Sequence, residues 1–392
     1  MIGMALFFMS SLLARAMCHS TVLPPPPGPT NVHMTHFPVV DAHRADPLAP
    51  CCNQPRRLML TLFQPAECSQ TEDFLYMPPA TAAVADAYFR GLGVFPNDSE
   101  TFSHLHLRAC PQSPENVDFP LLLFSHGYGL SRFDWSNLLQ WIASAGFNVV
   151  SIDHTYDANI VEFPDGSVIK GLNLTTLDQV LPMVQLLLQN RVADISTVLD
   201  FLSNATNTEG LGIPTLQTAR IGVFGHSLGG ATAADTALVD SRMVAGLALD
   251  GGIFANATQH PVQLPFVLIQ REGHNQSADA ALGELSSNVT QLWTQLKGSK
   301  LQLEIFGTVH DSFSDLPIVA DSIGLDVNTL PYAKYFVGTI DGLRLLNIER
   351  SYIKGFFEET LEAKQVDLLH GPSSEFPEVH YVNISTAAQA NA

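Results

Sequence analysis

One serine of this chain lies in a setting that suits a nucleophile. Ser227 is the central residue of a G-x-S-x-G pattern at 225–229, between a strand-like apolar run that starts at Ile221 and an alanine-rich segment typical of a helix. A sharp turn from strand to helix forces such a serine into a strained conformation with its Oγ exposed. Side chains in place of Gly225 and Gly229 would obstruct this turn. The pattern therefore predicts a nucleophilic Ser227.

A serine nucleophile needs a general base, which is most often a histidine. His310 lies in the loop after 301–306, a run whose early alternation of apolar and polar residues predicts the last strand of a sheet. His274 is the main rival, but it precedes this strand. We therefore expect His310 to be the base.

An acidic residue must orient the base. Asp250 follows the apolar run 243–249, at the carboxyl end of a predicted buried strand, where sites collect in open α/β sheets. Glu272 follows the next predicted strand, over 265–270, and is the alternative acid. Either choice keeps the chain order serine, acid, histidine that is typical of α/β-hydrolases.

Acyl transfer also needs backbone N–H groups that stabilise an oxyanion. The apolar run 119–124 leads into a loop that contains Gly127 and Gly129, which allow the amides of the loop to turn inward. In α/β-hydrolases such a loop supplies one donor, and the residue after the nucleophile supplies the other. The sequence therefore predicts the amides of Tyr128 and Leu228 as oxyanion donors.

Alternating strand and helix patterns must position these residues. Besides the runs above, the sequence predicts strands over 57–63 and 147–153, and helices over 134–145, 177–203 and 341–361. Such alternation is typical of a mostly parallel sheet with helices on both faces, and we expect the α/β-hydrolase fold. No motif of the chain calls for a metal or another cofactor.

Several segments together resemble the platelet-activating-factor acetylhydrolases, a family of secreted and intracellular phospholipases. The resemblance extends from about Arg57 to Glu359, and the segments that carry it include 124–129, 145–154, 225–232, 247–250 and 307–313. The resemblance implies that the nucleophile, acid and base are Ser227, Asp250 and His310. It also implies that the oxyanion amides belong to Tyr128 and Leu228.

This resemblance implies a substrate as well. The family removes short or oxidised sn-2 acyl groups from phosphatidylcholine through an acyl-enzyme, which makes a phospholipid or small ester the expected substrate. A general secreted carboxylesterase or polyester hydrolase would share every catalytic residue and is the alternative. A non-catalytic binding module of this fold usually lacks the serine or the histidine, and both are present here. Contact with a lipid interface and the oligomeric state are left open.

The chain of 392 residues divides into four predicted parts. Residues 1–16 are expected to be a signal peptide, since a short apolar core ends in an A-x-A cleavage pattern, which directs the protein out of the cell. Residues 17–50 are expected to be a proline-rich linker, 51–365 the catalytic domain, and 366–392 a C-terminal tail. The net charge of −19 argues against a nucleic-acid partner.

Sequons for N-glycosylation support this secretory route. Each of seven asparagines begins N-x-S/T without an intervening proline. The glycosylation candidates are Asn97, Asn173, Asn204, Asn256, Asn275, Asn288 and Asn383.

Four of the five cysteines are candidates for disulfides. Cys51, Cys52, Cys68 and Cys110 all precede the predicted nucleophile, and an even number in a secreted protein suggests two bridges. Adjacent cysteines pair only with strain. We therefore expect Cys51 and Cys52 each to pair with Cys68 or Cys110, in an order that the sequence leaves open.

Overall fold

A computed structural model gives the fold of the chain. It describes residues 20–51, 53–97, 99–114, 118–174, 176–213, 216, 218–252, 254–274 and 283–385, and all structural statements below concern these residues. The predicted signal peptide, Cys52 and Asn275 lie outside them.

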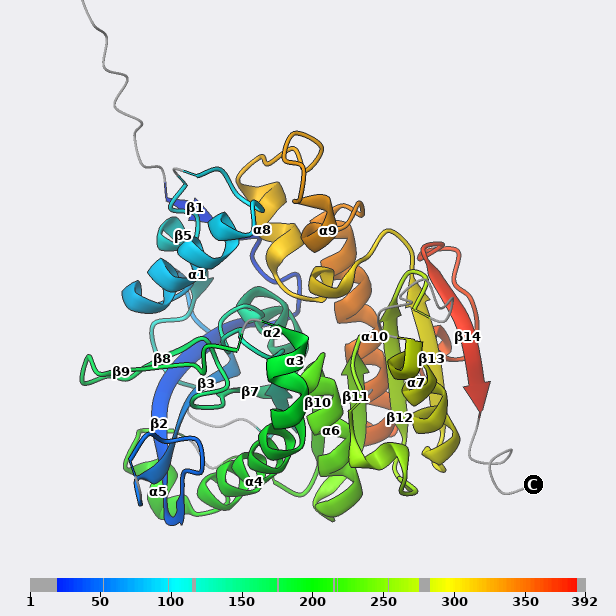
Figure 1. The fold of residues 1–392 in the computed structure, drawn as a ribbon, viewed down its shortest axis with the longest axis horizontal. Coiled ribbons are helices and arrows are strands. Elements are labelled where there is room, and N and C mark those ends of the chain that lie inside the picture. Colours follow the sequence, from blue (N-terminus) through cyan, green and yellow to red (C-terminus); the bar gives the residue numbers. More distant parts are fainter. Residues whose placement is uncertain are drawn as a thin grey trace, which may run out of the picture.

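A sheet of nine strands forms the centre of the molecule, in the order β14-β13-β12-β11-β10-β6-β7-β3-β2 (Figure 1). Its six middle strands, from β13 to β7, are all parallel, and the outer strands β14, β3 and β2 join them antiparallel. This confirms the predicted mostly parallel sheet. The strands are β2 (Asn31–Ala45), β3 (Pro55–Ala66), β6 (Leu121–Ser125), β7 (Asn148–Asp153), β10 (Ile221–His226), β11 (Met243–Leu249), β12 (Phe266–Arg271), β13 (Lys300–Ile305) and β14 (Val379–Ser385).

Helices cover both faces of this sheet, and each face has its own apolar core. Because successive side chains of a strand point to opposite faces, Phe124 and Phe224 belong to one core while Leu123 and Val223 belong to the other. The first core lies under α1 (Pro79–Gly91), α2 (Ser136–Ala143), α8 (Leu316–Ser322) and α10 (Gly342–Glu362). The second lies under α4 (Val184–Leu202), α6 (Leu228–Val239) and α7 (Gly283–Gln295).

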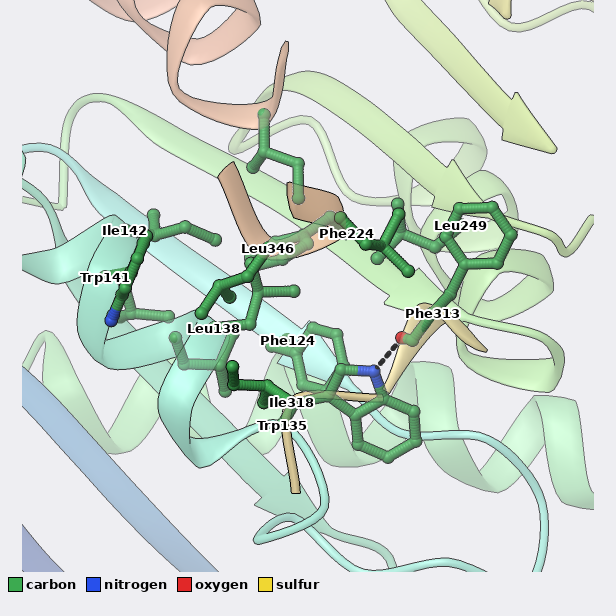
Figure 2. Packing of buried hydrophobic residues seen from close by; sticks show 14 of the residues in the cluster. Phe124, Trp135, Leu138, Trp141, Ile142, Phe224, Leu249, Phe313, Ile318 and Leu346 are labelled. Atoms are coloured by element: carbon green, nitrogen blue, oxygen red, sulfur yellow. Dashed lines mark hydrogen bonds between the residues drawn. The ribbon is translucent and has the colours of Figure 1, made fainter. Parts of the chain in front are cut away.

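Figure 2 shows part of the first core, where Trp135 packs against Phe124 with ring centroids 5.1 Å apart. The indole N–H of this buried Trp135 donates a hydrogen bond to the carbonyl oxygen of Phe313. Phe313 lies three residues after His310, so this contact ties the histidine loop to the start of α2. Trp135 thereby helps to fix the loop that carries the predicted base.

Shorter elements complete the fold. A three-stranded sheet in the order β1-β5-β4 and a β8–β9 hairpin lie beside the main sheet. No helix within the described ranges is long and apolar enough to cross a membrane. The short strands are β1 (Thr21–Val22), β4 (Glu72–Leu75), β5 (Leu105–Ala109), β8 (Ile160–Glu162) and β9 (Val168–Lys170). The short helices are α3 (Leu177–Val180), α5 (Ala205–Glu209) and α9 (Lys334–Val337), and the 3₁₀ turns are Phe102–His104, Leu181–Met183, Asn256–Thr258, His310–Phe313 and Asp367–Leu369.

The structure corrects the predicted domain boundaries at both ends. The described part of the predicted linker, residues 20–50, is not a linker, because β2 pairs with β3 over most of its length and buries Val32, Phe37 and Val39. Residues 366–392 are not only a tail, because β14 pairs antiparallel with β13. Within the predicted helix 177–203, Pro182 lies in a 3₁₀ turn that separates α3 from α4, since proline cannot donate the backbone hydrogen bond of a helix interior.

The predicted disulfide pairing is also wrong. Cys68 pairs with Cys110 at a Cα–Cα distance of 5.8 Å, and Cys51 is a free, exposed cysteine. The reason is the β2–β3 hairpin, whose connection contains Cys51. The 12 residues of β3 carry the chain about 35–40 Å from that connection to the end where Cys68 lies. Cys110 reaches the same end, where its amide donates to the carbonyl of Val32.

Candidate active site

The turn at Ser227 has the backbone strain that the sequence predicted. Ser227 follows β10 and precedes α6, with φ of 54° and ψ of −116°, a conformation that few residues other than glycine adopt. A Cβ atom at Gly229 would lie 1.9 Å from the carbonyl oxygen of Ser125, and one at Gly225 would lie 2.5 Å from the same oxygen. Both glycines are therefore required by the close approach of β6 to this turn.

The structure brings Ser227, His310 and Asp250 into one hydrogen-bonded series. Nε2 of His310 lies 2.9 Å from Oγ of Ser227, and Nδ1 lies 2.5 Å from Oδ2 of Asp250. The three residues follow β10, β13 and β11, so the parallel strands deliver them to one edge of the sheet. The alternative acid Glu272 instead accepts a hydrogen bond of 2.8 Å from the amide of Gly307.

Charge and burial tune the acid and the base in opposite directions. Burial alone would raise the pKa of the Asp250 carboxyl, but hydrogen bonds from His274 and His310 hold it well below its usual range. Burial alone would lower the pKa of His310, but the hydrogen bond and the negative charge of Asp250 raise it above its ordinary value of 6.5. The histidine is thus the stronger base of the two, as a group that accepts the proton of a serine must be.

Asp250 has further donors that the sequence did not reveal. Arg271 donates its amide to Oδ1 at 3.2 Å and its Nη1 to Oδ2 at 2.9 Å. His274, the rival candidate for the base, has its Nδ1 3.0 Å from Oδ1. His274 therefore contacts the acid of the series, whereas the ring that contacts the serine is that of His310.

The predicted oxyanion loop lies beside Ser227. The amides of Tyr128 and Leu228 donate to no other residue within the described parts of the chain, and both residues line the pocket above the serine. Gly127 is needed here as well, since a Cβ atom at this position would lie 2.8 Å from Nδ1 of His226. This geometry leaves two amides available to a ligand at Ser227.

A buried polar network supports this loop from below, and sequence reasoning missed it. Arg191 of α4 donates to Oγ of Ser125 at 3.0 Å, to the carbonyl oxygen of His126, and to both carboxylate oxygens of Asp157 at 2.7 and 2.5 Å. His154 joins the network through Nε2, which lies 2.9 Å from Oγ of Ser125. These side chains are fully buried, so they act on the loop and cannot reach a ligand.

A second part of the same network continues from His154. Its Nδ1 lies 2.9 Å from Oδ2 of Asp194, which also pairs with Arg56 at 2.6 Å. Burial lowers the pKa of His154 to about 4, although the hydrogen bond to Asp194 opposes this effect. Ser125, His154 and Asp194 thus repeat the residue types of the series at Ser227, but without access to solvent.

The pocket above Ser227 has a volume of about 240 Å³. Its walls come from α1, the oxyanion loop, the start of α4 and the histidine loop. Most of its lining side chains are apolar or aromatic, with a single acidic one. They include Tyr88, Phe89, Tyr128, Leu130, Val180, Val184, Phe254, Phe336 and Asp311.

The fold and the series at Ser227 define the class of the protein: it is an α/β-hydrolase. The profile of the family described as platelet-activating factor acetylhydrolase, isoform II, matches residues 99–165 and 179–365. The chain belongs to this family, as the resemblance of its motifs predicted, and is a carboxylic ester hydrolase.

Individual relatives agree with this assignment. A probable 1-alkyl-2-acetylglycerophosphocholine esterase of Arthroderma benhamiae is 30% identical over 95% of this chain and 97% of its own length. A platelet-activating factor acetylhydrolase of Cavia porcellus is 25% identical over 80% of this chain and 73% of its own. The solved structure of a ferulic acid esterase from Streptomyces cinnamoneus is similar with a TM-score of 0.77 and 28% identity, over 93% of this chain and 100% of its own.

Proposed function

We propose that this chain is a secreted serine esterase that hydrolyses short or oxidised sn-2 acyl esters of phosphatidylcholine. The observation that carries the proposal is the hydrogen-bonded series of Ser227, His310 and Asp250 at the base of a small apolar pocket. The esterase activity named for the relative in Arthroderma benhamiae supports the same substrate class.

The reaction follows from the positions of these groups. Ser227 Oγ attacks the ester carbonyl while Nε2 of His310, 2.9 Å away, takes its proton. The amides of Tyr128 and Leu228 stabilise the oxyanion of the tetrahedral intermediate. The protonated His310 then gives its proton to the leaving alcohol, and an acyl-enzyme remains. Water attacks this acyl-enzyme by the same steps in reverse, so the serine, the histidine and the proton balance are restored.

The size of the pocket supports a short acyl group. Its 240 Å³ is below the roughly 300–1,000 Å³ of sites that enclose small drug-like molecules. Phe89, Leu130 and Phe254 are among its apolar walls. An additional methylene that fits an apolar pocket gains about 1–3 kcal/mol at most. A chain that meets a wall gains nothing, so activity should drop sharply beyond a certain acyl length.

The single acidic residue of the pocket supports a choline ester. Asp311 lies in the same lining as Tyr88 and Phe336. Aromatic faces beside a carboxylate bind quaternary ammonium groups through cation–π and charge interactions. We therefore expect Asp311→Asn to raise KM for an acetyl phosphocholine ester more than for neutral p-nitrophenyl acetate. An equal change for the two substrates would remove this argument for a choline ester.

Features outside the pocket support secretion. Asn97, Asn173, Asn204, Asn256 and Asn383 are all exposed, as glycosylated asparagines must be, while Asn288 lies in α7. The Cys68–Cys110 disulfide is of the kind that persists in oxidising compartments. Expression in a eukaryotic host, followed by glycosidase treatment and sequencing of the N-terminus of the secreted protein, tests this part of the proposal. Retention in the cell without glycans would contradict it.

A kinetic series tests the substrate. Phosphatidylcholines with acetyl to palmitoyl groups at sn-2 are compared in excess EDTA, with p-nitrophenyl acetate as a general ester. We expect kcat/KM to fall steeply with chain length and to be unaffected by EDTA. A fluorophosphonate probe should label the wild type and not Ser227→Ala. Equal activity on long chains would refute the short-acyl preference, and labelling of Ser227→Ala would refute the nucleophile.

A general carboxylesterase is the second candidate. The aromatic walls of the pocket, which include Tyr88, Phe254 and Phe336, would also suit an aromatic acyl group, and the similar solved structure is a ferulic acid esterase. Methyl ferulate added to the kinetic series separates the two. A higher kcat/KM on methyl ferulate than on the acetyl phosphocholine ester would favour the second candidate.

A further inference from the structure

His274 is a histidine at the site to which the proposed mechanism gives no role. It follows β12 in the turn after Arg271, and its side chain is only 9% exposed. Its Nδ1 lies 3.0 Å from Oδ1 of Asp250, while Nδ1 of His310 lies 2.5 Å from Oδ2. Two imidazoles from different loops therefore hold the two oxygens of one carboxylate.

The contact between His274 and Asp250 restricts the rotation of the carboxylate group, which an aspartate alone does not restrict. The terminal torsion of an aspartate is soft and roughly two-fold, so one hydrogen bond does not fix the plane of its carboxylate. Asp250 also has a strained backbone, with φ of 42°, and the strand β11 ends just before it. The backbone N–H of Arg271 donates to Oδ1 at 3.2 Å, and the contact of 3.0 Å from Nδ1 of His274 adds a second donor on the same oxygen. Together they fix that plane and keep Oδ2 aligned with His310.

The charged groups near His274 within the described ranges lie at the ends of β11, β12 and β13 and in the loops that follow them. Arg271 Nη1 is 3.4 Å from Nδ1 of His274 but only 2.9 Å from Oδ2 of Asp250, so it is directed mainly at the carboxylate. Glu304 accepts from the amide of Gly273, and Glu272 accepts from that of Gly307, which fixes the turn that carries His274. A ring nitrogen that faces the carboxylate carries a proton, so Nδ1 of His274 is the donor.

We propose that His274 is a positioning residue for the esterase reaction, which holds Oδ1 of Asp250 so that Oδ2 keeps His310 in the orientation and tautomer needed for proton transfer. This inference rests on the proposed function, because it assigns His274 to the same series. It also explains why a histidine lies where the sequence alone suggested a rival base.

A matched pair of substitutions tests the proposal. Asn at position 274 keeps a side-chain N–H donor near the place of Nδ1, whereas Leu has a similar size and no donor. His274→Leu removes a hydrogen bond to a charged group, and the free energy that such a bond contributes corresponds to a decrease in kcat of about 10- to 100-fold. KM should stay unchanged, since His274 is not among the residues that line the pocket. His274→Asn should retain kcat within about threefold, because its amide can still donate to the carboxylate.

The pH profile of kcat/KM distinguishes a positioning role of His274 from a merely structural one, because a loss of structure alone would not shift this profile. Without the His274 donor, Asp250 becomes more basic and raises the pKa of His310 further, so the acidic limb of kcat/KM should shift to higher pH in His274→Leu and stay in place in His274→Asn. The rate of fluorophosphonate labelling gives the same comparison without any substrate. If His274→Leu does not fold, His274→Gln and His274→Met replace the pair.

The outcomes separate this inference from the proposed function. Wild-type protein that reacts with neither the probe nor any ester would refute the proposed function itself. Wild-type reactivity combined with an unchanged kcat and acidic limb in His274→Leu would overturn only the role of His274. Equal losses in the Asn and Leu variants would also overturn it, because donation to Oδ1 would then not be what matters.

Discussion

Replacement of Arg191 by methionine should both destabilise the protein and slow it. The guanidinium is fully buried and donates two hydrogen bonds to Asp157, at 2.7 and 2.5 Å. Methionine would leave the Asp157 carboxylate buried without its counter-charge, and removal of one partner of a buried ion pair costs about 3–5 kcal/mol. We expect the free energy of unfolding to fall by this amount in urea titrations followed by tryptophan fluorescence.

The same substitution should affect catalysis through the oxyanion loop. Arg191 also donates to Oγ of Ser125 and to the carbonyl oxygen of His126, two residues before Tyr128. Loss of an oxyanion donor costs about 10²–10³-fold in kcat. A loosened loop should cost less, so we expect a decrease of up to about 10²-fold on p-nitrophenyl acetate.

A double variant and a conservative one serve as controls. Arg191→Met with Asp157→Leu removes both charges, and replacement of a whole buried pair by apolar residues is often neutral. The double variant should therefore be more stable than Arg191→Met alone, yet remain slow, because the bonds to the loop are still lost. Arg191→Lys should be intermediate, since a lysine cannot form the two parallel bonds. A loss of less than about 1 kcal/mol in Arg191→Met, or a double variant no more stable than the single one, would refute this reasoning.

Three further predictions follow from the site. Asp250→Asn should lower kcat about 10⁴-fold, because His310 would adopt the wrong tautomer, whereas Glu272→Gln should lower kcat far less. The reverse order in steady-state kinetics would show that Glu272, and not Asp250, orients His310. The kcat/KM of the wild type should rise with pH through a pKa above 6.5, because His310 accepts a proton only when it is neutral and Asp250 raises its pKa. An acidic limb of the pH profile with a pKa below 6.5 would contradict the assignment of His310 as the base. Gly229→Ala should destabilise the protein by at least about 1–3 kcal/mol, the usual cost of overpacking, because its Cβ would overlap the carbonyl oxygen of Ser125. Gly91→Ala is the control and should be tolerated, since no heavy atom lies within 4 Å of the added Cβ. Equal melting temperatures for the two variants would refute the steric argument.

The positions of the three residues of the hydrogen-bonded series could be predicted, because local sequence patterns encode them. Ser227 and Asp250 each follow a short apolar run, and His310 follows the last parallel strand, so their positions at the sheet edge depend only on recognition of those strands. The parallel order of the strands then brings the three residues together. A prediction of this kind needs no knowledge of side-chain packing.

The outermost strand was missed for a physical reason. β2 contains Pro38 and several exposed polar residues, a composition that argues against a central strand. Proline is tolerated because β2 is the last strand of the sheet and has a hydrogen-bonded neighbour on one side only. The failure to see β2 also caused the wrong disulfide, since only the β2–β3 hairpin shows that Cys51 and Cys68 lie at opposite ends.

The buried ionic network could not have been predicted from local patterns. Arg191 and Asp194 lie on the core-facing side of α4, where a sequence reading expects apolar residues. Their partners Ser125, His154 and Asp157 come from the ends of β6 and β7, 34 to 66 residues away in the sequence, and Arg56 comes from β3, 138 residues away. Only the packing of α4 against the sheet makes these charges mutually satisfied, and therefore tolerable in the interior.

Two polar networks therefore meet at Ser227 from opposite sides of β10. Beyond β11, Arg271 and His274 contact Asp250, the proposed acid, and beyond β6, Arg191 donates to the loop that carries Tyr128, whose amide is a proposed oxyanion donor. The two networks share no residue, so each can be disturbed without loss of partners in the other, and the costs of such changes should add as free energies. The serine itself is fixed by neither network, because its position depends on the strained turn between β10 and α6. In the proposed mechanism, proton transfer, oxyanion binding and placement of the nucleophile are thus supported by three separate parts of one sheet edge, and the G-x-S-x-G pattern alone indicates only the placement of the nucleophile.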